Sequence, residues 1–347
     1  LSSPTRHVIY RATAVTASVL AGSTGNSGFA DGVGSEARFN VPTGLAVDNR
    51  ADGGVYVADS MNSCIRKISP SGRVTVVLGT PQVEGTMFGD ATPVSEAVMR
   101  GPSGVASVGR DFYFADTENH AIYYANFQKG EVRLLCGSPD EPGNTDGGFR
   151  TARFNRPTGL AISASGRLLA VADTGNNVIR LVGLTQDADG NVRGDVSTLG
   201  VGSSARGVEM SKAWRGDDPG DAIAFTGPKS VSFDATENVY VVDETGASVV
   251  TRPNGELPEK VDLAQPGFLG DPASVTVRGT QAFVLDESAA GDDQAILVAE
   301  VGAPRIDRVT PSTGGLAGGE PVVIRGQNFS KEAVVTTPIA ASAPIRC

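Results

Sequence analysis

The stretch that decides the fold is Ala37-Arg-Phe-Asn-Val-Pro-Thr-Gly-Leu-Ala-Val-Asp48, because the chain repeats it. A second copy is Ala152-Arg-Phe-Asn-Arg-Pro-Thr-Gly-Leu-Ala-Ile162, and a weaker one is Ala97-Val-Met-Arg-Gly-Pro-Ser-Gly-Val-Ala106. Two degenerate copies begin at Ile223 and Asp271. Internal self-similarity is the sequence signature of a repeat architecture. We therefore expect each copy to open one structural unit.

Each copy is followed by a β-rich run that ends in Asp, 14 to 17 residues after the proline of the copy. In the better copies a third run then begins at Asn and a fourth begins at Gly. Four short strands per unit, separated by Gly, Asn and Asp turns, are typical of a propeller blade. The second runs are Val55–Asp59, Phe112–Asp116, Leu169–Asp173, Val239–Asp243 and Ala282–Asp286; the third are Asn62–Ile68, Asn119–Tyr123 and Asn176–Val182.

The N-terminus carries only the second half of a unit. His7–Arg11 matches a third strand and Val15–Gly22 matches a fourth. A propeller must close into a ring to remove its exposed strand edges, so we expect these strands to complete the last blade. The sequence thus predicts an all-β propeller of five or six four-stranded blades, with six favoured.

These motifs resemble the NHL repeat family. The resemblance rests on the Pro-Thr-Gly-Leu-Ala-Val start at Pro42, the Val-Ala-Asp-x-x-Asn turn at Val57 and the Ile-Arg-Lys-Ile strand at Ile65. It covers residues 1–301, most strongly in the first three full repeats. It implies a β-propeller fold.

The remaining segment, 304–347, resembles the opening of an immunoglobulin-like IPT/TIG domain. Its motif runs from Pro304-Arg-Ile-Asp-Arg-Val-Thr-Pro through Gly-Gly-Glu-Pro-Val-Val-Ile-Arg-Gly-Gln-Asn-Phe329. An immunoglobulin-like sandwich needs ~100 residues. We therefore expect 304–347 to be the truncated start of such a domain in a longer protein.

Charge and composition narrow the function classes. The 347 residues carry a net charge of −10, and no basic stripe interrupts the acidic sequence. Phosphate backbones repel such a chain, which counts against nucleic-acid binding. No apolar run reaches the ~18 residues of a membrane span. The three cysteines Cys64, Cys136 and Cys347 allow at most one internal disulfide, and their pairing stays open.

The Asp-x-x-Asn turns recur in the first three repeats and have two interpretations. They could form a ring of metal or ligand carboxylates on one face, or their side chains could cap backbone amides at hairpin corners. We favour capping, because a functional site normally breaks a repeat rather than obeying it. For Arg66, Tyr123 and Arg180 of the third strand we expect inter-blade packing or ion pairs. The turn residues are Asp59 and Asn62, Asp116 and Asn119, and Asp173 and Asn176.

The sequence predicts no catalytic residue, metal ligand or cofactor. A catalytic zinc needs about three histidine ligands, whereas the chain has only His7 and His120. The run Asp187-Ala-Asp-Gly-Asn191 resembles the start of a calcium loop, but Thr198 stands where the bidentate Glu should be. A central cation held by carboxylates, as in lactonase-type propellers, stays open.

Two long connections, Thr80–Met99 and Val201–Ile223, break the repeat and are free to vary. The second contains the only tryptophan beside arginines, which is the composition of an interface hot spot; the alternative is that this side chain packs into a local cluster. Asn328-Phe-Ser330 is a glycosylation acceptor pattern if the protein is secreted. The candidate partner-binding residues are Arg206, Lys212, Trp214, Arg215 and Asp217.

The leading hypothesis is a non-catalytic protein-binding or adhesion module at the cell surface or outside the cell. A propeller followed by an immunoglobulin-like segment is a common ectodomain arrangement, and the resemblance implies such a role because some NHL propellers belong to surface glycoproteins. The partner would be another protein, and a membrane-anchored parent protein stays open. The alternatives are a lactonase- or lyase-type enzyme with a central metal and, against the sequence pI of 4.8, an RNA-binding NHL protein.

Overall fold

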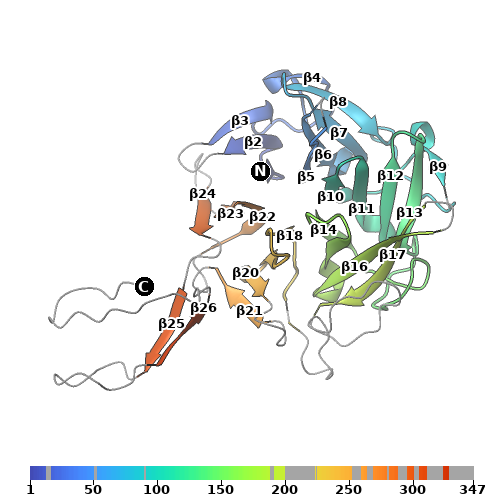
Figure 1. The fold of residues 1–347 in the computed structure, drawn as a ribbon. Helices are drawn as coiled ribbons and strands as arrows, with labels where there is room; N and C mark the ends of the chain where they lie inside the picture. Colours follow the sequence, from blue (N-terminus) through green and yellow to red (C-terminus); the bar gives the residue numbers. More distant parts are fainter. Residues whose placement is uncertain are drawn as a thin grey trace, which may run out of the picture.

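The computed structural model describes thirteen parts of the chain, and its regular elements there are β-strands and five single-turn 3-10 helices. The strands form antiparallel sheets arranged around a central axis (Figure 1). The described residues are 1–12, 17–50, 53–89, 91–187, 191–199, 223, 225–251, 259–263, 269–279, 281–287, 295–300, 305–310 and 323–327.

Five sheets begin with a strand of the repeated motif, and we number them blades 1 to 5. Blade 1 contains β5 (Pro42–Val47), β6 (Val55–Asp59), β7 (Cys64–Ile68) and β8 (Arg73–Leu78), with β4 (Gly32–Val33) on its outer edge. Blade 2 contains β10 (Pro102–Val108), β11 (Asp111–Asp116), β12 (Ala121–Asn126) and β13 (Glu131–Gly137), with β9 (Thr92–Pro93) outside. Blade 3 contains β14 (Pro157–Ile162), β15 (Leu168–Asp173), β16 (Val178–Gln186) and β17 (Val192–Thr198).

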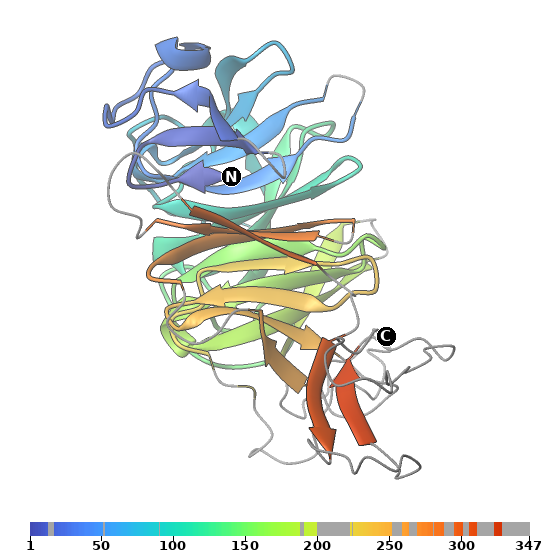
Figure 2. The same ribbon diagram turned by 90° about the vertical axis from the view of Figure 1, so that its left-hand side faces the viewer.

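The last two blades have the same order, and two smaller sheets lie at the chain ends. Blade 4 contains β18 (Ser230–Phe233), β19 (Val239–Asp243), β20 (Gly246–Thr251) and β21 (Glu259–Asp262); blade 5 contains β22 (Pro272–Arg278), β23 (Gln281–Asp286) and β24 (Ala295–Glu300). The N-terminal sheet contains β1 (Ser2–Ser3), β2 (Val8–Ala12) and β3 (Ala17–Gly22). In the IPT/TIG-like segment, β25 (Arg305–Thr310) pairs with β26 (Val323–Gln327) (Figure 2).

The ring contains five repeat blades together with the N-terminal sheet, within the predicted range of five or six. The expected completion of the last blade by N-terminal strands is wrong: β2 pairs with β1 and β3 in a sheet of its own, while β22, β23 and β24 pair with one another. The N-terminal strands do not join blade 5 because β1 (Ser2–Ser3) pairs with the inner edge of β2, the edge at which a strand of the last repeat was expected to pair. This N-terminal sheet lies between blade 5 and blade 1 (Figure 1).

The hydrophobic core lies between neighbouring sheets rather than at the centre of the ring. Tyr56 and Ile65 of blade 1 pack with Phe112, Phe114 and Tyr123 of blade 2 in one buried cluster. Similar clusters join blades 2 and 3, blades 3 and 4, blades 4 and 5, and the N-terminal sheet and blade 1. Aromatic and β-branched side chains on both faces of each strand therefore stabilise the ring by covering the next blade.

The Pro-x-Gly start has a physical reason in this ring. A Cβ added to Gly104 would lie 2.0 Å from the carbonyl oxygen of Thr158, on the innermost strand of the next blade. The residue before the glycine also ties adjacent inner strands together. Thr43 Oγ1 of blade 1 donates to Ser103 O of blade 2 at 3.0 Å, and Ser103 Oγ donates to Thr158 O of blade 3 at 3.2 Å. Glycine and a small hydroxyl residue together set the close approach of adjacent inner strands.

Candidate functional site

The Asp-x-x-Asn turns form buried clamps inside the blades. Asp59 and Arg66 are both fully buried, with Arg66 Nη1 3.0 Å from Asp59 Oδ2. The other carboxylate oxygen accepts from the backbone N–H of Asn40 at 2.7 Å, and Asn62 Nδ2 donates to Asp59 Oδ2 at 2.9 Å. The carboxylates therefore do not form an open ring on one face. Blade 3 repeats the arrangement with Asp173, Asn176, Arg180 and the N–H of Asn155.

Each clamp fixes the connection that enters its own blade. Asn62 Nδ2 also donates to Gly28 O at 2.9 Å, and Arg66 Nη2 donates to Ala30 O and to Asp31 Oδ1, both at 2.6 Å. In blades 2 and 3, Asn119 and Asn176 hold Gly85 O and Gly143 O in the same way. The arginine ion pairs thus lie within a blade, rather than between blades as the sequence had allowed.

Blade 2 departs from this pattern because Tyr123 replaces the arginine. The Tyr123 hydroxyl donates to Met87 O at 2.8 Å, so a side chain at this position still bonds the connection that leads into blade 2. The neighbouring carboxyl lacks the cation that the other clamps have, and burial raises the pKa of Asp116 to about 7. In blade 3, where Arg180 is present, burial raises the pKa of Asp173 to about 6.

The two histidines occupy equivalent positions in their units and join adjacent sheets. His7 Nδ1 accepts from the N–H of Val41 at 3.1 Å, and His120 Nδ1 accepts from the N–H of Arg156 at 3.0 Å. Both donor residues have left-handed backbone, with φ of 55° and 52°. In blade 3 the side chain of Asn177 takes the place of the histidine and accepts a hydrogen bond from the backbone N–H of Gly227, which precedes blade 4. The histidines are therefore inter-blade contacts that lie in different sheets.

The substitution His120→Asn is expected to reduce the loss of stability on acidification. Asparagine can keep the inter-blade hydrogen bond, because Asn177 makes the equivalent one: its Oδ1 accepts from the N–H of Gly227 at 2.8 Å. Burial lowers the pKa of His120 below its usual 6.5. A lowered folded-state pKa means that the unfolded chain binds the proton more readily, so the stabilisation is present above pH 6.5 and is lost as pH falls. The midpoint of thermal unfolding, measured from pH 7.5 to 5, should fall less for the variant.

The reciprocal change Asn177→His serves as the control and should steepen the same dependence. Identical pH profiles for the parent and both variants would contradict this account of the histidine contact.

The described thiols are not nucleophiles. Cys64 and Cys136 are free and buried, and burial raises the pKa of both; that of Cys64 reaches about 12. Cys347 lies outside the described residues. Thiolates rather than thiols react as nucleophiles, so neither buried cysteine offers one at neutral pH.

The calcium-like run forms part of a hairpin turn where it is described. Asp187 Oδ1 accepts from the N–H of Asn191 at 2.8 Å, and Arg193 Nε lies 3.2 Å from Asp187 Oδ2. Asp189 lies outside the described residues. Across the described chain, no group of three or more His, Cys, Asp or Glu side chains is placed to hold a metal ion.

The partner-binding and glycosylation candidates from the sequence all lie outside the described residues and stay predictions. They are Arg206, Lys212, Trp214, Arg215, Asp217 and Asn328.

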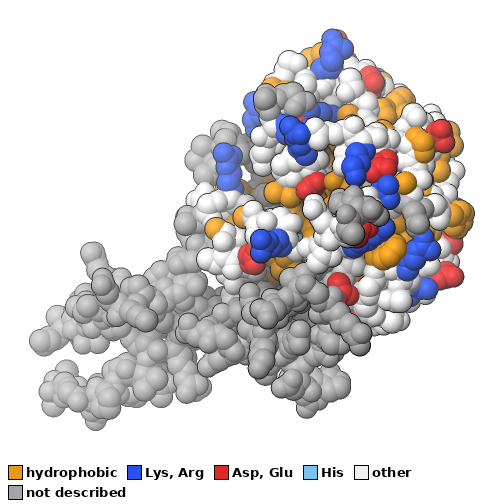
Figure 3. All heavy atoms as spheres, turned by 45° about the vertical axis from the view of Figure 1, so that its right-hand side comes forward, with side chains coloured by type: hydrophobic (Ala, Val, Ile, Leu, Met, Phe, Trp, Pro, Cys, Tyr) orange, Lys and Arg blue, Asp and Glu red, His pale blue; other side chains and the backbone are white. Residues whose placement is uncertain are grey.

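The first long connection is described almost completely and exposes apolar side chains. Phe88 is 74% exposed and Val83 is 46% exposed. The connection lies beside the turn of blade 1, because the N–H of Gln82 donates to Asn62 O at 2.8 Å, and the adjacent Met61 is 60% exposed. In Figure 3, hydrophobic side chains lie between interspersed acidic and basic ones on the face that it presents.

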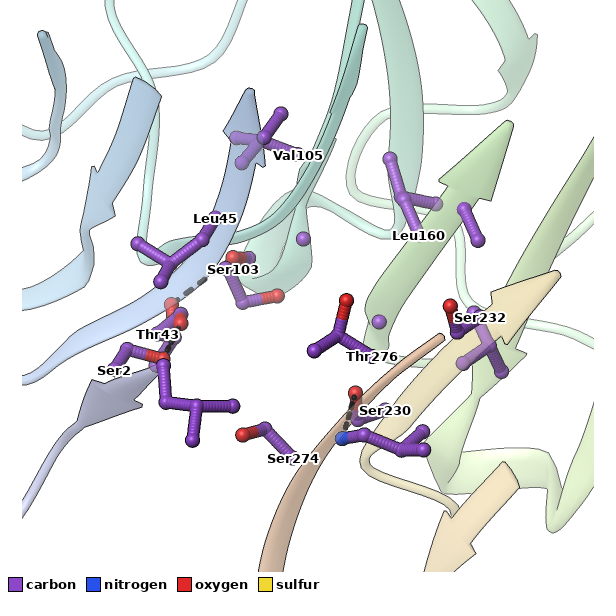
Figure 4. A pocket seen from close by; sticks show the side chains of 18 of the residues that line it. Ser2, Thr43, Leu45, Ser103, Val105, Leu160, Ser230, Ser232, Ser274 and Thr276 are labelled. Carbon is purple, nitrogen blue, oxygen red and sulfur yellow. Dashed lines mark hydrogen bonds between the residues drawn. The ribbon is translucent and has the colours of Figure 1, made fainter. Parts of the chain in front are cut away.

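A cavity of about 710 Å³ lies where the innermost strands converge (Figure 4). It is lined by the N-terminal sheet and by β5, β10, β14, β18 and β22. Sequence reasoning did not single out its residues, although the signal was present. The Gly-Leu-Ala of the first and third copies becomes Ser230-Val-Ser232 and Ser274-Val-Thr276 in the two degenerate copies. This change places hydroxyl groups on one side of the cavity.

Within the described residues, no helix has the length and apolar character needed to cross a membrane.

Comparison with known proteins agrees with this architecture. The family model for the NHL repeat matches residues 39–68, and the model for the IPT/TIG domain matches residues 304–340. The chain is 32% identical over 156 residues to human NHL repeat-containing protein 2, covering 43% of this chain and 22% of that protein. It is 31% identical over 166 residues to mouse Teneurin-4, covering 43% of this chain and 6% of that protein.

The chain thus spans less than a quarter of the length of these relatives. Among solved structures, a chain in a crystal structure of a nidogen/laminin complex aligns with a TM-score of 0.47 and 17% identity, covering 75% of this chain and 76% of that chain. The repeated strands, the blade topology and the two family matches lead to one identification. This chain contains a β-propeller in which residues 39–68 match the NHL repeat, followed by a segment that matches the IPT/TIG domain.

Proposed function

We propose that this chain is a non-catalytic protein-binding module of an extracellular or cell-surface protein. The observation that carries the proposal is the exposure of three large apolar side chains on and beside the first long connection, Met61, Val83 and Phe88. Exposed hydrophobic groups of this kind, among polar neighbours, are typical of protein interaction sites. We propose residues 1–301 as the propeller unit and 304–347 as the start of the IPT/TIG unit.

Two further features support a binding role. Along the chain, the second long connection, with Trp214 and its neighbouring arginines, links blade 3 to blade 4, as Thr80–Met99 links blade 1 to blade 2. Aromatic and arginine side chains dominate interface energetics. We therefore expect both connections to contact the same partner.

The test is proximity labelling on intact source cells with the full chain as bait, followed by measurement of Kd for each recovered surface protein. Truncating an interface hot spot costs at least about 2 kcal/mol, so Phe88→Ser combined with Met61→Ser should weaken binding by about 30-fold or more. Val19→Ser is the matched control, since Val19 is 44% exposed on β3, away from this connection.

Equal loss of binding in the control would contradict the proposed surface. If intact cells gave no surface protein that binds the purified chain, the protein-binding function itself would be wrong. Biotinylation of intact cells tests the compartment, because an extracellular chain must be labelled without lysis.

The enzymatic alternative with a central metal has its own measurement. Elemental analysis of the purified protein by mass spectrometry would detect a stoichiometric calcium or transition metal. Such a metal would favour the lactonase- or lyase-type alternative and would direct attention to the central cavity.

A further inference from the structure

The central cavity is lined by both apolar and hydroxyl side chains. Blades 1 to 3 contribute Leu45, Val105 and Leu160 together with Thr43 and Ser103, and blades 4 and 5 contribute Ser230, Ser232, Ser274 and Thr276 (Figure 4). In the last two copies of the repeat, hydroxyl residues stand where the first and third copies have glycine and alanine. This departure from the repeat adds hydroxyl groups to the cavity in blades 4 and 5.

Three of these hydroxyl groups keep their protons available. Ser230 Oγ accepts from the N–H of Val275 at 3.2 Å, and Ser232 Oγ accepts from the N–H of Val277 at 3.1 Å. An accepting hydroxyl can still donate its own proton. Within the described part of the chain, no acceptor is found for the protons of Ser230, Ser232 or Thr276.

The charged side chains at the cavity are already engaged. Lys229 Nζ lies 2.9 Å from Asp271 Oδ1 in an ion pair. Glu287 Oε1 accepts from Ser3 Oγ at 2.6 Å and from Thr5 Oγ1 at 3.2 Å. An ionic ligand would have to compete with these partners, so the chemistry of the cavity suits an uncharged one.

The volume of about 710 Å³ falls within the ~300–1,000 Å³ typical of small-molecule sites, which combine apolar walls with a few placed polar groups. We propose that the central cavity binds a neutral, largely apolar small molecule that accepts hydrogen bonds from Ser230, Ser232 and Thr276. Its apolar body contacts the leucine and valine side chains of blades 1 to 3. This site is separate from the surface proposed for a protein partner.

The probe for the test is prodan, a neutral naphthalene ketone whose fluorescence shifts to the blue in apolar surroundings. The full chain should bind it saturably with a blue-shifted emission. Thr276→Val keeps the side-chain shape and removes one donor, so it should raise Kd about three- to tenfold, as for one neutral hydrogen bond. Thr75→Val, at an exposed position of β8 outside the cavity, should leave Kd unchanged.

Three outcomes would overturn the proposal. The first is the absence of saturable prodan binding by a chain whose thermal unfolding shows that it is folded. The second is an equal effect, or no effect, of both threonine variants. The third is binding of the anionic probe anilinonaphthalene sulfonate with the same affinity and the same response to Thr276→Val. Because Thr276 lies apart from Phe88, partner binding in the proximity assay should be the same for Thr276→Val and the parent.

Discussion

Replacing Arg66 by Met should lower the free energy of unfolding by about 3–5 kcal/mol, the usual cost of removing one partner from a buried ion pair. Both Arg66 and Asp59 are fully buried, so the variant leaves the carboxylate without its cation in the interior. It also removes the donors that hold Ala30 O and Asp31. Urea denaturation followed by fluorescence, with the linear dependence on denaturant, gives the difference directly.

A surface pair supplies the control for this prediction. Arg133 is paired with Glu131 at 2.9 Å, but both side chains are partly exposed. Arg133→Met should therefore cost no more than about 1 kcal/mol. The double variant Asp59→Asn with Arg66→Met should be less destabilised than the sum of its single changes, because it no longer buries an unpaired charge. Additive losses would contradict the clamp as described.

Gly104→Ala is expected to destabilise the protein by about 3 kcal/mol, the upper part of the range for overpacking. The added methyl group would lie 2.0 Å from Thr158 O and 2.8 Å from Leu160 N. Both atoms belong to the backbone of the next blade, so relief requires the inner strands of blades 2 and 3 to separate. The shift in the urea midpoint of unfolding measures the cost.

The matched control is Gly148→Ala, where the nearest atom to an added Cβ is Thr151 Oγ1 at 3.9 Å. Its effect should stay within about 0.5 kcal/mol, as for most surface substitutions. If Gly104→Ala and Gly148→Ala unfolded at the same urea concentration, close blade approach would not be the reason for the Pro-x-Gly motif.

The strands were predictable from the sequence because their signals are local. The run Val55–Asp59 and its counterparts match β6, β11, β15, β19 and β23. The repeated Pro-x-Gly tripeptide at Pro42, Pro102 and Pro157 marks the start of the innermost strand in blades 1 to 3. Alternating side chains, Gly turns and β-branched residues act within a few positions of the chain.

The site was less predictable, since its parts come from separate blades. The two histidines are 113 positions apart and look unrelated in the sequence, yet each meets the next sheet in the same way. The hydroxyl groups of Ser230, Ser232 and Thr276 were visible as a weakening of the repeat, but their common side of the cavity was not. The partner-binding prediction at Trp214 lies outside the described residues and rests on composition.

The sequence by itself therefore determined the blade unit, the positions of its strands and the resemblance of its last segment to the IPT/TIG domain. It did so because hydrogen bonding within a blade joins segments that are close along the chain. The separate N-terminal sheet, the partners of the buried carboxylates and the lining of the central cavity were decided only by the tertiary structure. These features depend on how each blade rotates against the next, and that rotation is set by packing between side chains that are far apart in the sequence.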